Sequence, residues 1–189
     1  VVGQAGEVLP RDEVGIGQRI GADDAGGLRE AAVQAPVDQQ ARGTVDAPLG
    51  RDPNNRLKQA VRKDGREAIT HYEVDSRYGG DGWEVTALSC MLETGRTHQI
   101  RVHMAHIGHP LLADPVYATG FATKANRLPE PLKSAVTGLG RQALHAAELG
   151  FEHPVTGEEL AFEAPFPPDM MALEAALEPF DQSLPGMRG

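Results

Sequence analysis

WEVTALSCMLETGRTHQIRVHMAHIGHP (residues 83–110) contains the two elements that decide the fold, a strand followed directly by a helix. Apolar residues alternate along residues 83–93, which predicts a β-strand. Thr97 is then a suitable N-cap for a helix. The helix itself is predicted from apolar residues at helical spacing, namely Ile100, Met104 and Ile107. Gly108 and Pro110 should end it.

The preceding run, AITHYEVDSRY (residues 68–78), alternates in the same way, and GGDG separates it from the strand at residues 83–93. This arrangement predicts an antiparallel hairpin. Within the second strand the apolar phase shifts near Ala87 and Leu88, so one face cannot stay buried throughout. We therefore expect irregular pairing there. Cys90 is the only cysteine, and within a strand it is expected to be a small buried residue.

Further signals divide the chain. Residues 149–165 read as a second hairpin with its turn at Thr156 and Gly157, and residues 168–180 as a closing helix. Short strands interleaved with a few helices predict an α+β domain. Residues 1–42 carry no sustained apolar period, although residues 26–35 could form a short helix. We therefore divide the chain into three parts: a poorly defined N-terminal region (1–42), a main domain (43–180) and a tail (181–189).

Composition limits the class of protein. With 189 residues, of which 40% are hydrophobic, the chain can bury one sizeable core, so we expect one main domain and a monomer. No signal-peptide pattern and no apolar run long enough to span a bilayer is visible, so we expect a cytoplasmic protein without a membrane partner. The net charge of −9 argues against general nucleic-acid binding, but the charge is unevenly distributed.

The middle of the chain is its basic part. RDPNNRLKQAVRKDGR (residues 51–66) has six basic residues against two acidic ones. Lysine and arginine displace counterions from phosphates, and the neighbouring amides can hydrogen-bond phosphate oxygens. Arg56, Lys58 and Arg62 are therefore candidate RNA contacts. The alternative is a solvated surface loop, because charged surface runs are common.

Histidines gather after the second strand, which raises the hypothesis of a metal site. The candidates are His98, His103, His106 and His109, with Asp114 beyond them. His103, His106 and His109 cannot all face one metal unless the helix continues past Gly108, which Pro110 discourages, and His98 lies on a different face. Structural or phosphate-contacting histidines are therefore the preferred interpretation. No phosphate-binding loop or nucleophile-elbow context is visible, and we expect neither a metal nor a cofactor.

LETGRTHQIRVHMAHIGHPLLADPVY (residues 92–117) closely resembles the third signature motif of the ribosomal large-subunit type of pseudouridine synthases. The resemblance extends upstream through residues 43–74 and downstream through residues 141–170. It covers about two thirds of the chain. The family isomerises uridine within RNA, so the resemblance implies RNA, chiefly ribosomal, as the partner.

The resemblance also implies a mixed, largely antiparallel sheet with flanking helices, a cleft for RNA and a flipped uridine. Arg101 matches the family arginine that pairs with the catalytic aspartate. Such an arginine can stabilise the negative charge of departing uracil. Arg96, His98 and Gln99 match the flanking positions and are assigned to substrate or phosphate contact.

The chain departs from the family at the catalytic motif. QRIGADDAGGL (residues 18–28) is the nearest match, and it places Gly21 where the aspartate should be. Asp23 is the candidate substitute acid. Residues 1–42 are then either foreign to the family's domain, as in an out-of-frame translation, or part of a protein that lost catalysis. Three functions follow: a pseudouridine synthase, inactive if no acid replaces the aspartate; a non-catalytic RNA-binding module of the same fold; and a histidine-rich metal protein.

Overall fold

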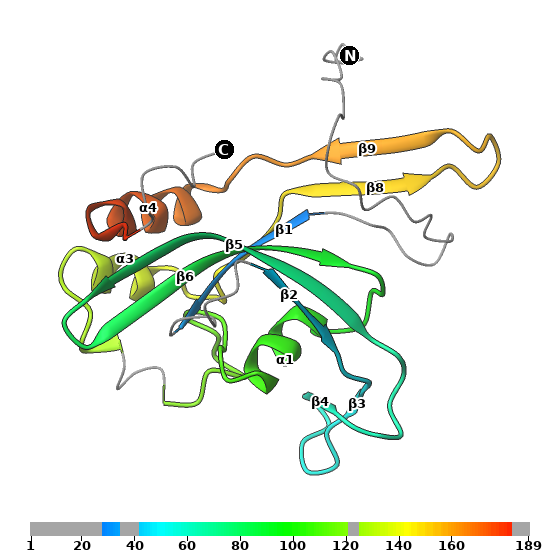
Figure 1. Cartoon of the computed structure of the whole chain (residues 1–189), viewed down its shortest axis with the longest axis horizontal. Helices are drawn as coiled ribbons and strands as arrows, with labels where there is room; N and C mark the ends of the chain where they lie inside the picture. Colours follow the sequence, from blue (N-terminus) through cyan, green and yellow to red (C-terminus); the bar gives the residue numbers. More distant parts are fainter. Residues whose placement is uncertain (1–27, 35–41, 121–124, 183–189) are drawn as a thin grey trace.

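A five-stranded antiparallel sheet forms the centre of the molecule in the computed structural model, which describes residues 28–34, 42–120 and 125–182 (Figure 1). For residues 28–30 and 34 it describes the backbone alone. The strand order is β2-β5-β6-β1-β7. These strands are β1 (Leu28–Gln34), β2 (Arg42–Asp46), β5 (Ile69–Gly80), β6 (Trp83–Leu92) and β7 (Leu144–Ala146).

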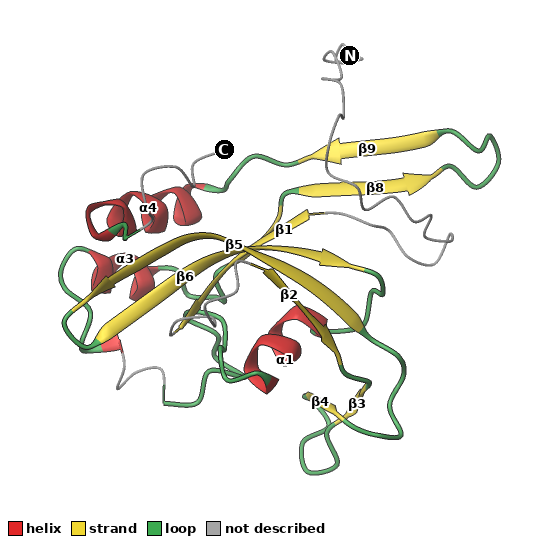
Figure 2. Cartoon of the chain, in the orientation of Figure 1, coloured by secondary structure: helices red, strands yellow, loops and turns green. Residues whose placement is uncertain are grey.

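Two smaller antiparallel hairpins complete the strands of the described residues (Figure 2). They are formed by β3 (Leu49–Arg51) with β4 (Gln59–Val61), and by β8 (Glu148–Glu152) with β9 (Glu159–Glu163). The helices of the described residues are α1 (Gln99–His106), α3 (Leu132–Gly138), α4 (Pro168–Leu177) and the 3-10 turn η1 (Glu178–Phe180). The α+β class is confirmed, as are the hairpin predicted over residues 149–165 and the closing helix.

The hairpin predicted over residues 68–93 is also confirmed, together with its irregularity. Val74 pairs with Leu88 and Ser76 pairs with Ala87, so Asp75 is an extra residue in β5. This bulge changes the buried phase of β6 at the predicted place. Leu88 and Cys90 are both 0% exposed. Burial raises the pKa of the Cys90 thiol to about 12, so the thiol stays protonated.

The helix predicted over residues 26–35 is wrong, because residues 28–34 form the strand β1. The strand lies between β6 and β7 and pairs with both. Ala31, Ala32 and Val33 are buried in succession, because both faces of the strand are covered. The small, non-periodic side chains gave no strand signal, and pairing on both sides overrides their helical propensity. Part of the region assigned to residues 1–42 therefore belongs to the central sheet.

α1 begins one residue later than predicted. His98, in the left-handed conformation with φ 60°, is the N-cap in place of Thr97, and no side chain caps the first turn. The end of α1 is as predicted. Gly108 has φ 90°, its N–H bonds to the Ala105 carbonyl at 3.1 Å, and the N–H of His109 bonds to the Met104 carbonyl at 2.8 Å. This is a Schellman ending, for which glycine is the favoured residue.

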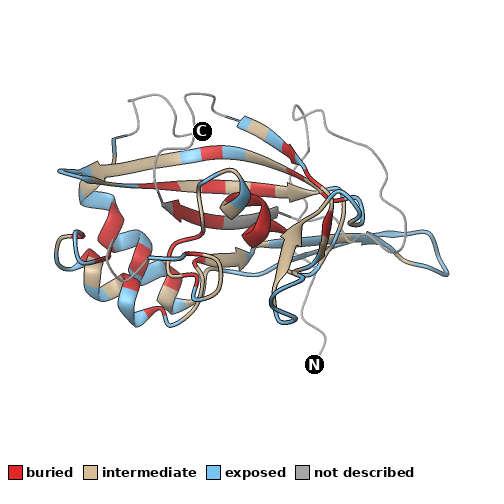
Figure 3. Ribbon diagram, turned by 90° about the horizontal axis from the view of Figure 1, so that it is seen from below, coloured by how far each residue is buried: buried red, intermediate tan, exposed pale blue. Residues whose placement is uncertain are grey.

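Two main apolar clusters lie between the sheet and the helices. Figure 3 shows where the buried residues fall along the ribbon. One joins Ala32 and Val85 of the sheet to the buried faces of α3 and α4. The other packs Ile100 and Met104 of α1 against the sheet. α1 is thereby fixed against the sheet with its first turn beside β5. No helix within the described residues is long and apolar enough to cross a membrane.

Candidate functional site

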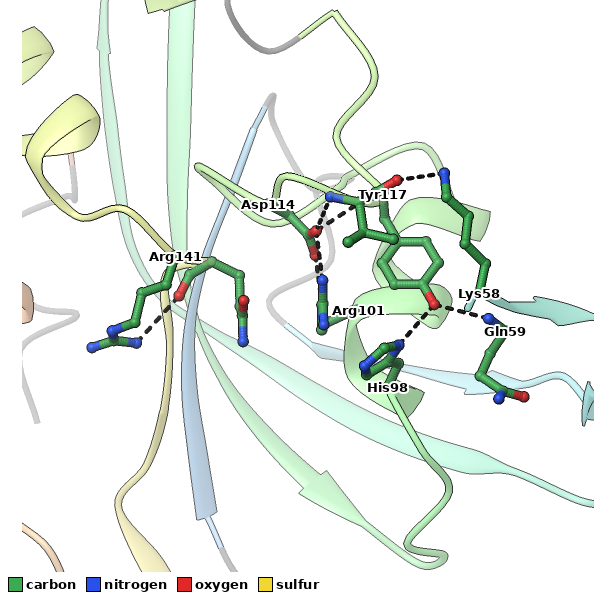
Figure 4. A network of polar contacts seen from close by, with 9 residues as sticks. Lys58, Gln59, His98, Arg101, Asp114, Tyr117 and Arg141 are labelled. Atoms are coloured by element: carbon green, nitrogen blue, oxygen red, sulfur yellow. Dashed lines mark hydrogen bonds and ion pairs between the residues drawn. The ribbon is translucent and has the colours of Figure 1, made fainter. Parts of the chain in front are cut away.

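Arg101, the third residue of the motif helix α1, forms a buried ion pair with Asp114 from the loop that follows the helix (Figure 4). Its Nε and Nη2 donate to Oδ2 and Oδ1 of the carboxylate, both at 2.8 Å. Oδ1 also accepts the backbone N–H groups of Val116 at 2.8 Å and Tyr117 at 3.0 Å. Among the described residues, no hydrogen bond engages Nη1, so this donor remains for another group.

This pair stays charged over a wide pH range. Burial acts to raise the pKa of Asp114, but the hydrogen bonds from Arg101 and the two backbone groups outweigh it and lower the pKa. The hydrogen bond to Asp114 raises the pKa of Arg101 above its ordinary value. The result is a fixed guanidinium whose orientation is set by a fork of two hydrogen bonds.

The Tyr117 ring contacts the same guanidinium. The Arg101 carbon Cζ lies 5.0 Å from the centre of the Tyr117 ring, a cation–π contact. The Tyr117 hydroxyl accepts the backbone N–H of Gln59 at 2.9 Å and lies 2.9 Å from Nδ1 of His98. Figure 4 shows these side chains converging from α1, the loop after it and the start of β4. Tyr117 thus ties the three segments together.

His98 is neutral in this setting. Burial, followed by the nearby charge of Arg101, lowers the pKa of His98. Because the Tyr117 hydroxyl already accepts a hydrogen bond from Gln59, it can donate its own proton to an unprotonated Nδ1 of His98. His98 and Tyr117 also meet edge to face, with ring centres 5.7 Å apart.

The two other residues assigned to substrate contact are bonded within the chain. Gln99 is 3% exposed, and its Nε2 donates to the Ile69 carbonyl at 2.9 Å and the Thr70 hydroxyl at 3.1 Å. Its Oε1 accepts from Thr94 Oγ1 and from the Arg96 backbone N–H. Arg96 donates from Nε to the Glu67 carbonyl at 3.0 Å. Both residues therefore hold the turn before α1 on the edge of β5.

His103 is a structural histidine. It is 0% exposed, and its two ring nitrogens lie 2.9 Å from Thr70 Oγ1 and from the Ala47 carbonyl oxygen. Burial lowers the pKa of His103. His106, by contrast, is exposed. Within residues 28–34, 42–120 and 125–182, no three histidine, cysteine or acidic side chains gather as a metal site would require.

The basic strip lies on the β3–β4 hairpin. Lys58 reaches the site, because its Nζ donates to the Val116 carbonyl at 2.7 Å and lies 5.9 Å from the centre of the Tyr117 ring. Arg62 instead pairs with Asp64 through two hydrogen bonds. Arg56 is exposed in the loop between the strands. The strip therefore borders the Arg101 cluster at Lys58 and extends away from it into solvent.

Gly21 and Asp23 lie outside the described residues. Asp114 and Tyr117 are the residues that sequence reasoning missed as partners of Arg101. One signal pointed to Asp114, since it is the only carboxylate between Glu93 and Glu130 and so the nearest available counter-ion in the chain after α1.

Comparisons with known proteins agree on one family. Residues 29–106 match the family model described as RNA pseudouridylate synthase. The chain is 53% identical over 117 residues to ribosomal large subunit pseudouridine synthase D of Xanthomonas campestris, covering 61% of this chain and 34% of that protein. It is 41% identical over 174 residues to an uncharacterized RNA pseudouridine synthase of Chloroflexus aurantiacus, covering 80% and 48%.

The chain thus spans between about a third and a half of the length of these relatives. Among solved structures, the human RNA pseudouridylate synthase domain containing 1 shares the fold, with a TM-score of 0.58 and 23% identity over 77% of this chain and 57% of that one. The sequence match, the shared fold and the motif arginine on α1 all lead to one assignment: this chain belongs to the pseudouridine synthase family, of the ribosomal large-subunit type.

Proposed function

We propose that this chain binds RNA and isomerises uridine to pseudouridine, with large-subunit ribosomal RNA as the substrate class. The sequence similarity to a synthase named for that subunit supports the substrate class. The observation that carries the proposal is the geometry of Arg101, which is fixed by Asp114 and Tyr117 and keeps Nη1 for a further partner. The cytoplasm is the proposed location, because such an RNA is found there.

In this proposal the target uridine leaves its stack, and Arg101 stabilises the charge that develops when the glycosidic bond breaks. Arg101 Nη1 would reach the uracil or the acid that attacks the nucleotide, and Asp114 would keep the guanidinium from turning away. Lys58 and Arg56 would contact phosphates along the bound strand. His98 would contact the substrate as a neutral donor through Nε2, since Nδ1 faces Tyr117.

A second candidate is a non-catalytic RNA-binding module of the same fold. One observation favours it: Gly21 stands where the family resemblance places the catalytic aspartate, and the match to the family model begins only at Arg29. Glycine supplies no carboxylate, so activity would depend on a substitute such as Asp23.

Tritium release from RNA labelled at C5 of uridine separates the two candidates. The natural chain should release tritium, Arg101→Ala should reduce the rate at least about a hundredfold, and Asp23→Ala should abolish release if Asp23 is the substitute acid. RNA binding without any release would establish the binding module instead. A chain that neither binds nor releases would refute both.

A further inference from the structure

The β8–β9 hairpin is an exposed two-stranded ribbon, separate in its hydrogen bonding from the central sheet (Figures 1 and 2). β8 lies next to β1, and β9 lies on the side of β8 that faces away from β1. Most residues of both strands are exposed on both faces. None of the residues assigned to the RNA site lies on the ribbon, so its side chains have no role in the proposed reaction.

One face of the ribbon is apolar. Leu149 pairs with Phe162 and Phe151 pairs with Leu160, so the four side chains share one face. The rings of Phe151 and Phe162 stack with their centres 5.9 Å apart, yet Phe151 is 37% exposed and Phe162 is 53% exposed. A contiguous exposed apolar patch on a soluble chain is characteristic of an interaction site.

The opposite face is acidic. Glu148 pairs with Glu163, and Glu152 pairs with Glu159, which places like charges directly across the ribbon. Residues 142–187 contain nine acidic residues and no lysine or arginine. Such a face repels RNA phosphates and attracts cationic side chains. The ribbon is thus complementary to a partner that carries both cationic and apolar side chains.

Within the part of the chain that the structure describes, no strand pairs with the outer edge of β9, and this edge supplies the means of binding. The N–H of His153 bonds to the Glu158 carbonyl and the N–H of Ala164 bonds to the Ala147 carbonyl, which fixes the alternation of the ladder. By that alternation the backbone groups of Ala161 point away from β8. An edge strand with outward N–H and C=O groups is a template for an added strand.

We propose that the β8–β9 ribbon binds an extended cationic segment of another protein, which adds to β9 as a third strand. Alternate side chains of that segment would be apolar, over Phe151 and Phe162, and basic, over the glutamates. The charge complementarity, the apolar face and the open edge all select this occupant, and the proposal does not depend on the RNA chemistry of the Arg101 site.

A short fluorescein-labelled peptide that alternates valine and lysine tests this by fluorescence anisotropy with the full chain. We expect saturable binding that weakens with salt and at least about tenfold weaker binding to Phe162→Ser and to Glu159→Lys. Ala161→Pro removes an outward N–H and should weaken binding similarly, whereas Ala161→Thr keeps that N–H and should bind normally. The matched charge control is Glu174→Lys on the exposed side of α4.

Four results would overturn the proposal. The first is absence of peptide binding. The second is an equal loss of binding with Glu159→Lys and Glu174→Lys, which would indicate general attraction to an acidic protein. The third is a dimer, seen by light scattering, that Phe162→Ser abolishes, because a second copy would then be the occupant. The fourth is binding of a uridine oligonucleotide that Phe162→Ser abolishes. Circular dichroism and thermal melting of each variant confirm that the fold is retained.

Discussion

At the scale of the residue, two arginine–aspartate pairs of the same geometry differ in burial. Arg101 and Asp114 have side chains that are 10% and 0% exposed, whereas Arg141 and Asp169 are 35% and 34% exposed. Both pairs are joined by two hydrogen bonds from Nε and Nη2. Removing one partner of a buried pair leaves an uncompensated charge, while water can solvate the remaining partner of an exposed pair.

Asp114→Asn should therefore lower the free energy of unfolding by about 3 kcal/mol, because the guanidinium of Arg101 loses its counter-ion inside the protein. Asp169→Asn, the matched control, should cause a much smaller loss. Urea denaturation of the three chains measures the difference. Equal losses for the two variants would mean that Asp114 does not hold a buried charge.

His103 should make stability depend on pH. The unfolded chain takes up a proton near the ordinary histidine pKa of about 6.5, but burial lowers the pKa of folded His103. The unfolded state therefore binds more protons below that pH. The contribution of His103 to the free energy of unfolding is fully present above that pH and is lost as the solution is acidified. His98, whose pKa burial also lowers, contributes in the same direction.

His103→Gln tests this assignment. It should reduce stability by about 2 kcal/mol at neutral pH, because the hydroxyl of Thr70 or the carbonyl of Ala47 loses its partner. It should also flatten the fall in stability between about pH 7.5 and about pH 5. His106→Gln, at an exposed position, should leave stability at neutral pH unchanged and should change the slope much less than His103→Gln, because the charge of His106 is only a lesser cause of the lowered pKa of His103, after burial. Urea denaturation across that pH range would contradict the assignment if His103→Gln kept the slope of the natural chain.

Residue types and motif spacing identified Arg101, but not what surrounds it. Asp114 lies 13 positions away in sequence, beyond the end of α1, and only the turn at Gly108 and the loop after it bring the two together. The hydrogen bond from Gln99 to the Thr70 hydroxyl and the burial of His103 likewise depend on the position of β5. Local pattern carries no information about such contacts between distant segments.

At the scale of the element, the β3–β4 hairpin depends on one glycine. A Cβ on Gly65 would lie 2.6 Å from the Leu49 carbonyl carbon and 2.7 Å from its oxygen, and these are backbone atoms that cannot turn aside. Gly65→Ala should therefore displace the hairpin that carries Lys58 and lower the melting temperature by several degrees. Gly95→Ala, where a Cβ meets nothing within 4 Å, is the control and should melt like the natural chain.

The elements that the sequence predicted are those with a local signal. The β5–β6 hairpin alternates and has a glycine turn, and α1 has a helical repeat with Gly108 after it. β1 was missed because its identity as a strand comes from pairing with β6 and β7. Strands as short as β3 and β7 span too few residues to establish a period.

At the scale of the whole molecule, charge is divided between two hairpins. The β3–β4 hairpin carries the basic strip, and the β8–β9 ribbon carries paired glutamates, while Figure 1 shows the two at different edges of the molecule. An acidic chain can bind RNA if the strand follows the basic hairpin and avoids the ribbon. The net charge of −9 alone would have hidden this division.

Salt dependence of RNA affinity tests that path. Each phosphate contact releases counterions, so the logarithm of the binding constant should fall linearly with the logarithm of salt concentration. Arg56→Gln should weaken binding of a uridine-containing RNA at low salt and reduce the magnitude of the slope by about one. Lys133→Gln on α3, which Figure 1 places away from the β3–β4 hairpin, should leave the slope unchanged. If Arg56→Gln also left it unchanged, the basic hairpin would lie outside the RNA interface, and its charges would serve solubility alone.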